Sequence, residues 1–177
     1  FIFISALAFL PSNMNKVLLP YLFKIPFKNN EKKFNFIFRM YSKLFLIVSY
    51  FIFINIFLFA KDIIPLLFGA KYIKSIDVLV YASFSIPFLF IVSEIIITTL
   101  DKQHVNMRNQ AIAFVFHVII NFILIYYYHA NGAAIATAFT FLVIYILSHR
   151  YLIKNKIISY GPVFKEKIII LLFTGGL

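Results

Sequence analysis

The sequence predicts an all-α protein, a polytopic bundle of transmembrane helices, and three observations lead to this fold class. The chain of 177 residues is 63% hydrophobic and only 13% charged, whereas a soluble domain is about half apolar and about a quarter charged. Its apolar residues form runs near the ~20 residues that a helix needs to cross a bilayer. These runs are continuous rather than alternating, which disfavours the strands of an outer-membrane barrel.

Five membrane spans are predicted along the chain. They cover residues 1–23, 44–60, 78–100, 110–128 and 132–149. The last two come from one uncharged stretch that is too long for a single helix. Polar residues and a glycine between Tyr126 and Gly132 divide this stretch.

The connecting segments differ in positive charge, and this predicts the orientation of the spans. Segments 24–43, 101–108 and 150–167 together contain thirteen Lys and Arg residues, against three in 61–77. Because basic loops stay in the cytoplasm, the first three segments are predicted to be cytoplasmic. Short connections also predict that consecutive helices pack as antiparallel hairpins.

Two regions follow from these spans. Residues 1–152 are predicted to form the transmembrane bundle, and residues 153–177 a cytoplasmic loop with the start of a further, truncated span near Ile168. The chain begins at Phe1 inside an apolar run and ends inside another. We therefore expect a piece of a longer polytopic protein.

The first basic segment is predicted to contain an amphipathic helix over about 31–43 that runs into the second span. Its apolar positions recur at steps of three and four residues, which is helical spacing. They are Phe34, Ile37, Phe38, Tyr41 and Phe45. We interpret this helix as an orientation anchor at the cytoplasmic headgroups, with attraction of anionic lipid or a pyrophosphate head as the functional alternative.

Three ionisable residues lie inside predicted spans, where such groups are costly and usually face protein or a water-filled cavity. They are Lys16, Glu94 and His117. Counted from the cytoplasmic ends at 1.5 Å per residue, Lys16 and Glu94 are each expected to lie roughly 10–12 Å deep, and His117 is expected at a similar depth. With Asn121, they are the candidate residues of a substrate or coupling cavity.

Each candidate also has a structural interpretation. The long stem of Lys16 can reach the headgroups, and His117 and Asn121 can form hydrogen bonds between helices. We expect Asn13, Asn15 and Asn55 to form such bonds as well. Pro87 is expected to kink its span, because proline interrupts helical bonding.

No motif predicts an enzyme, a metal site or a cofactor. The chain has no cysteine, and its four histidines lack metal-ligand spacing. The six acidic residues are scattered, with no paired-carboxylate cluster, nucleophile elbow or phosphate-binding glycine loop. A net charge of +11 would suggest nucleic acid in a soluble protein. Here the charges lie between apolar runs, so no nucleic-acid partner is predicted.

Several short features occur in an order that is typical of one family. They are Leu18-Leu19-Pro20, the basic segment 28–43, KDIIPLLFG at 61–69, Lys71-Tyr72, Val78-Leu79, Tyr81-Ala82, Asp101-Lys102-Gln103, Asn121 and GAAIAT at 132–137. Over about 18–150, the chain thereby resembles the C-terminal half of the polysaccharide (O-antigen type) flippases of the MATE-like superfamily. It departs from their pattern in lacking a proline near Ser49 and in having Ala130-Asn131 before Gly132, which leaves the subfamily open.

The resemblance implies a MATE-like fold with two six-helix lobes around a cavity. It implies a transporter, not an enzyme, that flips an undecaprenyl pyrophosphate-linked oligosaccharide across the bacterial inner membrane by alternating access. The product would serve cell-surface polysaccharide biosynthesis, such as the O-antigen of lipopolysaccharide. The implied partners are the lipid-linked oligosaccharide, the lipid bilayer and a coupling H+ or Na+. Depth and charge suggest that Lys16 attracts the pyrophosphate and that Glu94 couples or gates transport.

Two other functions stay open. A multidrug/cation exporter of the same superfamily would favour acidic cavity residues, and the spans offer only Glu94. A membrane polysaccharide polymerase or glycosyltransferase would need a large catalytic loop, and the longest loops here have about 20 residues.

The orientation can be tested by labelling single cysteines, which the cysteine-free chain makes unambiguous. Cysteines placed in 24–43 and 101–108 should react only with membrane-permeant reagents in intact cells. Cysteines in 61–77 should also react with impermeant reagents from outside. Finding 24–43 and 61–77 on the same side would contradict the predicted spans.

Overall fold

The computed structural model describes residues 9–11, 13, 16–17, 20, 31–89 and 92–158. Within these ranges every regular element is a helix, as predicted. In chain order they are α3 (Glu31–Phe68), the 3-10 helix η1 (Ala70–Ser75), α4 (Ile76–Ser83), α5 (Ile86–Leu89), α6 (Val92–Thr99) and α7 (Gln103–Lys154). Most of the predicted first span and the truncated span from Ile168 lie outside the described residues.

Helix α3 is continuous over 38 residues. The predicted surface helix over 31–43 and the predicted second span over 44–60 are therefore one helix, which continues as far as Phe68. Its predicted apolar stripe faces the core, where Phe34, Ile37, Phe38 and Phe45 are buried. Burial of this stripe against the rest of the bundle accounts for the continuity, because most helical stability comes from packing of an apolar face.

The predicted third span is bent rather than straight. The segments Ala70–Ser83 and Ile86–Thr99 meet at an angle of 46°. Pro87 explains the bend, because proline has no N–H to bond to the carbonyl four residues earlier, that of Ser83, and its ring clashes with this carbonyl. The kink expected at Pro87 is thus present.

Two buried serines stabilise this bend. The Ser83 hydroxyl donates to the carbonyl of Val80, and the Ser85 hydroxyl donates to the carbonyl of Ala82, both at 2.6 Å. The Ser85 backbone N–H also bonds to Ala82, at 3.0 Å, in a three-residue turn. Side-chain donors thereby bond to backbone carbonyls next to a break, as proline-broken helices in a membrane require.

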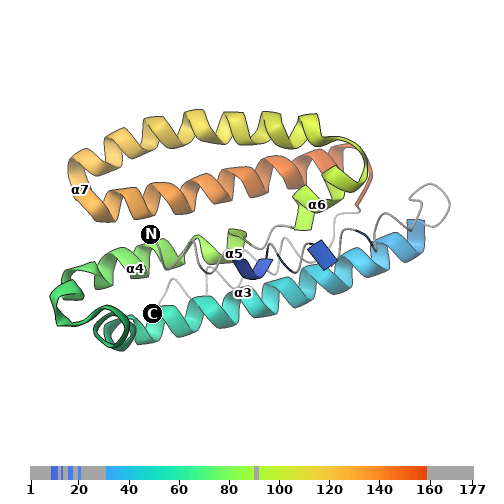
Figure 1. The fold of residues 1–177 in the computed structure, drawn as a ribbon. Helices are drawn as coiled ribbons and strands as arrows, with labels where there is room; N and C mark the ends of the chain where they lie inside the picture. Colours follow the sequence, from blue (N-terminus) through green and yellow to red (C-terminus); the bar gives the residue numbers. More distant parts are fainter. Residues whose placement is uncertain are drawn as a thin grey trace.

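Helix α7 is a hairpin of two long arms, 103–128 and 130–154, that fold back on each other (Figure 1). The break is at His129, with φ 52° and ψ −127°. It lies within the Tyr126–Gly132 interval where the sequence predicts the separation of two spans. A non-glycine residue in this conformation costs about 1–3 kcal/mol, which the packing of the two arms must offset.

Gly132 begins the run of small residues at the start of the predicted fifth span, and its role is in packing. It lies in the second arm and is buried. A Cβ at this position would collide with the backbone carbonyl of Leu124 in the first arm. Gly132 therefore permits the close approach of the arms, as small residues do between membrane helices.

Two of these helices, Lys33–Phe68 and Gln103–Lys154, are long and apolar enough to cross a membrane, or three if the bent pair forms one span. Their outward faces are apolar. Phe122 on α7, for example, is 82% exposed. Many other large apolar side chains of α3 and α7 are also exposed, and such surfaces need a non-aqueous environment. The described part of the chain is therefore that of a membrane protein.

Basic residues gather at one end of the helix stack. In Figure 1 the start of α3 and both ends of α7 lie at the same end, whereas η1 and the α7 turn lie at the other. The chain direction alternates from α3 to α4–α6 and through the two arms of α7. Segments predicted to be cytoplasmic, 31–43, 101–108 and 150–156, thus lie together.

Replacing Gly132 with alanine should destabilise the α7 hairpin. The added methyl group has to displace backbone, so we expect a loss of about 1–3 kcal/mol, typical of overpacking. Thermal unfolding of the full protein in detergent would measure the loss. Ala111→Val, which adds two carbons at an exposed position of the first arm, is the matched control. Equal stability of the two variants would contradict the close contact.

Candidate functional site

Glu94 is part of a polar group between α6 and the first arm of α7. Gln110 Nε2 donates to Glu94 Oε1 at 3.4 Å. Asn106 Nδ2 donates to the Glu94 backbone carbonyl at 2.9 Å and to Thr98 Oγ1 at 3.0 Å. Thr98 in turn donates to the same Glu94 carbonyl, at 2.9 Å. The carboxylate thus has only one long side-chain contact within the described residues and is available as an acceptor.

His117 and Asn121 form a second polar group, which joins the two arms of α7. His117 Nδ1 lies 2.7 Å from Thr140 Oγ1. The Thr140 hydroxyl donates to the Ala136 carbonyl at 2.8 Å, so it accepts its bond from His117. Asn121 Nδ2 lies 3.3 Å from His117 Nε2. A neutral imidazole with its proton on Nδ1 satisfies all of these contacts.

A third polar contact also links the two arms. Asn109 in the first arm donates to the hydroxyl of Ser148 in the second, at 3.3 Å, and both residues are buried. Buried polar groups in an apolar bundle are hydrogen-bonded as a rule, since an unmet donor costs about 1–3 kcal/mol. Asn109 and Ser148 therefore help to set the pairing of the arms.

Five polar residues of the first arm share one face. Asn106, Asn109, Gln110, His117 and Asn121 lie within about 120° of the helix circumference at 3.6 residues per turn. We call this set the polar face. Its partners come from α6 at the near end and from the second arm further along. An apolar helix with such a face can hold polar or charged groups of a ligand inside a membrane.

The structure does not bring the four sequence candidates together at one site. His117 and Asn121 are in contact, whereas Glu94 lies beside Gln110, seven residues or roughly 10 Å earlier along the arm. Lys16 is helical and exposed. No hydrogen bond or ion pair links Lys16 to the other three in the described part of the chain.

Several residues of the site were not singled out from the sequence, namely Asn106, Asn109, Gln110, Thr140 and Ser148. For Asn106, Asn109 and Gln110 the signal was present in the spacing of the polar face at three-, four- and seven-residue steps. Thr140 and Ser148 lie in the second arm, and no comparable spacing marked them. The described residues show no interhelical bond for Asn13, Asn55 or Asn121, contrary to the prediction. Asn13 and Asn55 each donate to the carbonyl four residues earlier, and Asn121 contacts His117 four residues earlier in the same arm. Asn15 lies outside the described residues.

Chemically, the site offers amides, hydroxyls, one imidazole and one carboxylate. Over the described ranges, no group of three or more His, Cys, Asp or Glu residues is arranged to hold a metal ion. Such a set can bind polar groups and transfer protons through Glu94 and His117.

No family model, curated protein or solved structure matches this chain. The resemblance to polysaccharide flippases therefore rests on the short sequence features alone.

The contact between the arms at His117 can be measured by a double-mutant cycle. His117→Ala combined with Thr140→Val should show a coupling of about 0.6 kcal/mol, and at most ~1.7 kcal/mol, as is typical of membrane interhelical bonds. Thr137→Val is the matched control, because the Thr137 hydroxyl donates to the Ala133 carbonyl of its own arm. Coupling of His117 to Thr137 but not to Thr140 would refute the assignment.

Proposed function

We propose that this chain is the C-terminal part of a membrane transporter that flips a lipid-linked oligosaccharide across the bacterial inner membrane by alternating access. The substrate would be an undecaprenyl pyrophosphate-linked oligosaccharide for cell-surface polysaccharide biosynthesis. The chain would supply about five spans and the start of a sixth to a MATE-like, two-lobe bundle. The observation that carries this proposal is the polar face of α7, set in helices that are otherwise apolar.

A static membrane anchor would not need this polar face. Each amide or imidazole within a membrane helix is costly unless it is bonded, and the face contains five such residues over four turns. Several of its side chains are only half-buried, and Gln110 is exposed. In a transporter, these groups would line the path of the polar part of the substrate.

The arrangement of the helices is also compatible with alternating access. Consecutive helices run antiparallel, and the bend at Pro87 divides the third span. Broken helices beside a polar path are a recurrent feature of transporters. The gathering of basic residues at one end supports a cytoplasmic location for that end.

Two residues are assigned roles within this proposal. Lys16 attracts the pyrophosphate, because an ammonium group is a strong point charge for phosphate. Glu94 couples transport to H+ or Na+ or acts in gating. Among the acidic residues of the described candidate spans, Glu94 contacts the polar face, through Gln110.

Glu94→Gln and Lys16→Ala in the full-length protein should each lower glycan export on the order of tenfold, equivalent to about 1.4 kcal/mol. Export would be measured as surface polysaccharide in a strain that depends on this protein, with membrane expression quantified in parallel. Asp101→Asn is the matched control for Glu94→Gln, because it makes the same chemical change at an exposed position after the same span.

Normal export from both site variants at normal expression would reject these roles. An equal loss from Asp101→Asn would show that any removal of negative charge impairs the protein. Loss of expression together with export would show that the residues are needed for the stability of the protein rather than for transport itself.

A further inference from the structure

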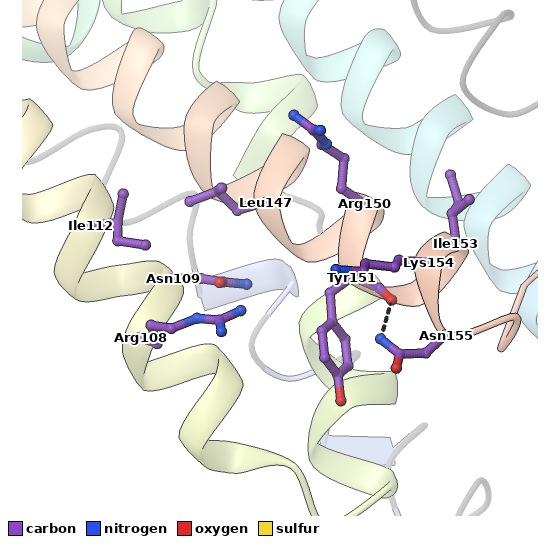
Figure 2. Close-up of a pocket in the computed structure, with 9 residues that line it drawn as sticks. All are labelled: Arg108, Asn109, Ile112, Leu147, Arg150, Tyr151, Ile153, Lys154 and Asn155. Carbon is purple, nitrogen blue, oxygen red and sulfur yellow. Dashed lines mark hydrogen bonds between the residues drawn. The ribbon is translucent and has the colours of Figure 1, made fainter.

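A basic hollow lies between the two arms of α7, at the end where both arms terminate (Figure 2). Its volume is about 600 Å³, within the range of small-molecule sites. The first arm contributes Arg108 and Asn109 to its wall, and the second contributes Arg150, Tyr151 and Lys154. The hollow is separate from the polar contacts of Glu94 and His117.

The charged residues that line the hollow are all positive. Its lining includes three cations and no Asp or Glu. Figure 2 shows Arg108 extending from the first arm toward Tyr151 on the second. Arg150 and Lys154 are four residues apart and therefore share one side of the second arm. All three are exposed, and in the described ranges none forms an ion pair with a carboxylate, so they are available to an anion.

The floor of the hollow is held in place by the chain itself. Asn109 is 1% exposed and bonds to Ser148 across the arms. At the rim, Asn155 Nδ2 donates to the Tyr151 carbonyl at 2.8 Å, the contact dashed in Figure 2. The Asn109–Ser148 bond fixes the separation of the two arms that carry the cations, and the Asn155 bond closes the end of the second arm.

Apolar residues continue the hollow toward the middle of the helices. Ile112 lies one turn beyond Arg108 in the first arm and is 47% exposed. Leu147 lies one turn before Tyr151 in the second arm. The site is thus cationic at the end of the helices and apolar one turn deeper. A phospholipid has its charged and apolar parts in the same order, with its phosphate at the membrane surface and its acyl chains beneath.

We propose that this hollow binds the phosphate group of an anionic phospholipid at the cytoplasmic surface of the membrane. Guanidinium groups form paired, charge-assisted bonds to phosphate oxygens. Basic pockets between membrane helices on the cytoplasmic side are suited to anionic headgroups. The bound lipid cross-links the ends of the α7 hairpin, and this binding does not depend on whether the protein transports a glycan.

The test is lipid binding to the full-length protein, purified in mild detergent and measured by native mass spectrometry. The lipids are phosphatidylglycerol and, as the zwitterionic comparison, phosphatidylcholine. We expect phosphatidylglycerol to bind about tenfold or more tightly, equivalent to ~1.4 kcal/mol. The double variant Arg108→Gln/Arg150→Gln should lose this preference, whereas Arg108→Lys/Arg150→Lys, which keeps the charge but not the planar fork, should retain part of it.

The control variant is Lys61→Gln/Lys74→Gln, which removes two exposed cations, one near the end of α3 and one in η1, away from the hollow. It should bind phosphatidylglycerol like the unmodified protein. Equal losses in both double glutamine variants would overturn the site in favour of general surface charge. Equal binding of the two lipids to the unmodified protein would overturn it as well.

Inorganic phosphate distinguishes a lipid site from a site for a free anion. At millimolar concentration it should not displace phosphatidylglycerol, because the lipid also uses the apolar part of the hollow. Complete displacement would overturn the lipid assignment. A thermal unfolding midpoint equal to that of the unmodified protein, measured without lipid, would show that the glutamine variant is folded and that its binding loss is local.

Discussion

The backbone of a helix inside a lipid bilayer has no water to bond to, and this constraint explains most of the arrangement of this chain. Long helices satisfy most of their interior N–H and carbonyl groups within themselves, as α3 does over its 38 residues except at Pro65, which has no N–H to donate. The breaks in the helices lie beside side-chain donors or at an end of the stack. At the α4–α5 bend, the hydroxyls of Ser83 and Ser85 donate hydrogen bonds to backbone carbonyls near the break. At His129, the break lies at one end of the stack.

The same constraint governs the side chains. Polar residues of the candidate spans meet one another across helices, as Asn109 meets Ser148 and His117 meets Thr140. These contacts align the two arms of α7, while Gly132 allows them to approach closely. Pairing and close packing therefore act together, because small residues bring the arms near enough for short polar side chains to bond.

The basic residues follow a pattern that extends over the whole helix stack rather than over single contacts. The basic residues lie mainly at the end of the stack where α3 begins and both arms of α7 terminate. The polar face of α7 extends from that end into the apolar body. In the proposed transporter, the polar face serves the moving substrate, and the basic hollow holds a lipid at the edge. A single hairpin would then combine a transport path with an anchor to the membrane surface.

Much of this architecture follows from local sequence patterns. The period of the apolar residues in 34–45 predicts the buried face of α3, and the polar interval before Gly132 predicts the break in α7. Pro87 predicts a bend because its effect on helical bonding is intrinsic to the residue. These features depend on near neighbours in the chain, so the sequence alone is sufficient for them.

The partners of the polar residues could not be derived in this way. Asn55 and Asn106 are the same residue type, yet Asn55 bonds within its own helix and Asn106 bonds to α6. The basic hollow depends likewise on residues about forty positions apart being brought to one end of the hairpin. The sequence by itself determined the helices, their breaks and the end that carries the charge. Only the tertiary structure decided which polar groups meet, because that depends on the rotation and separation of packed helices rather than on spacing along one of them.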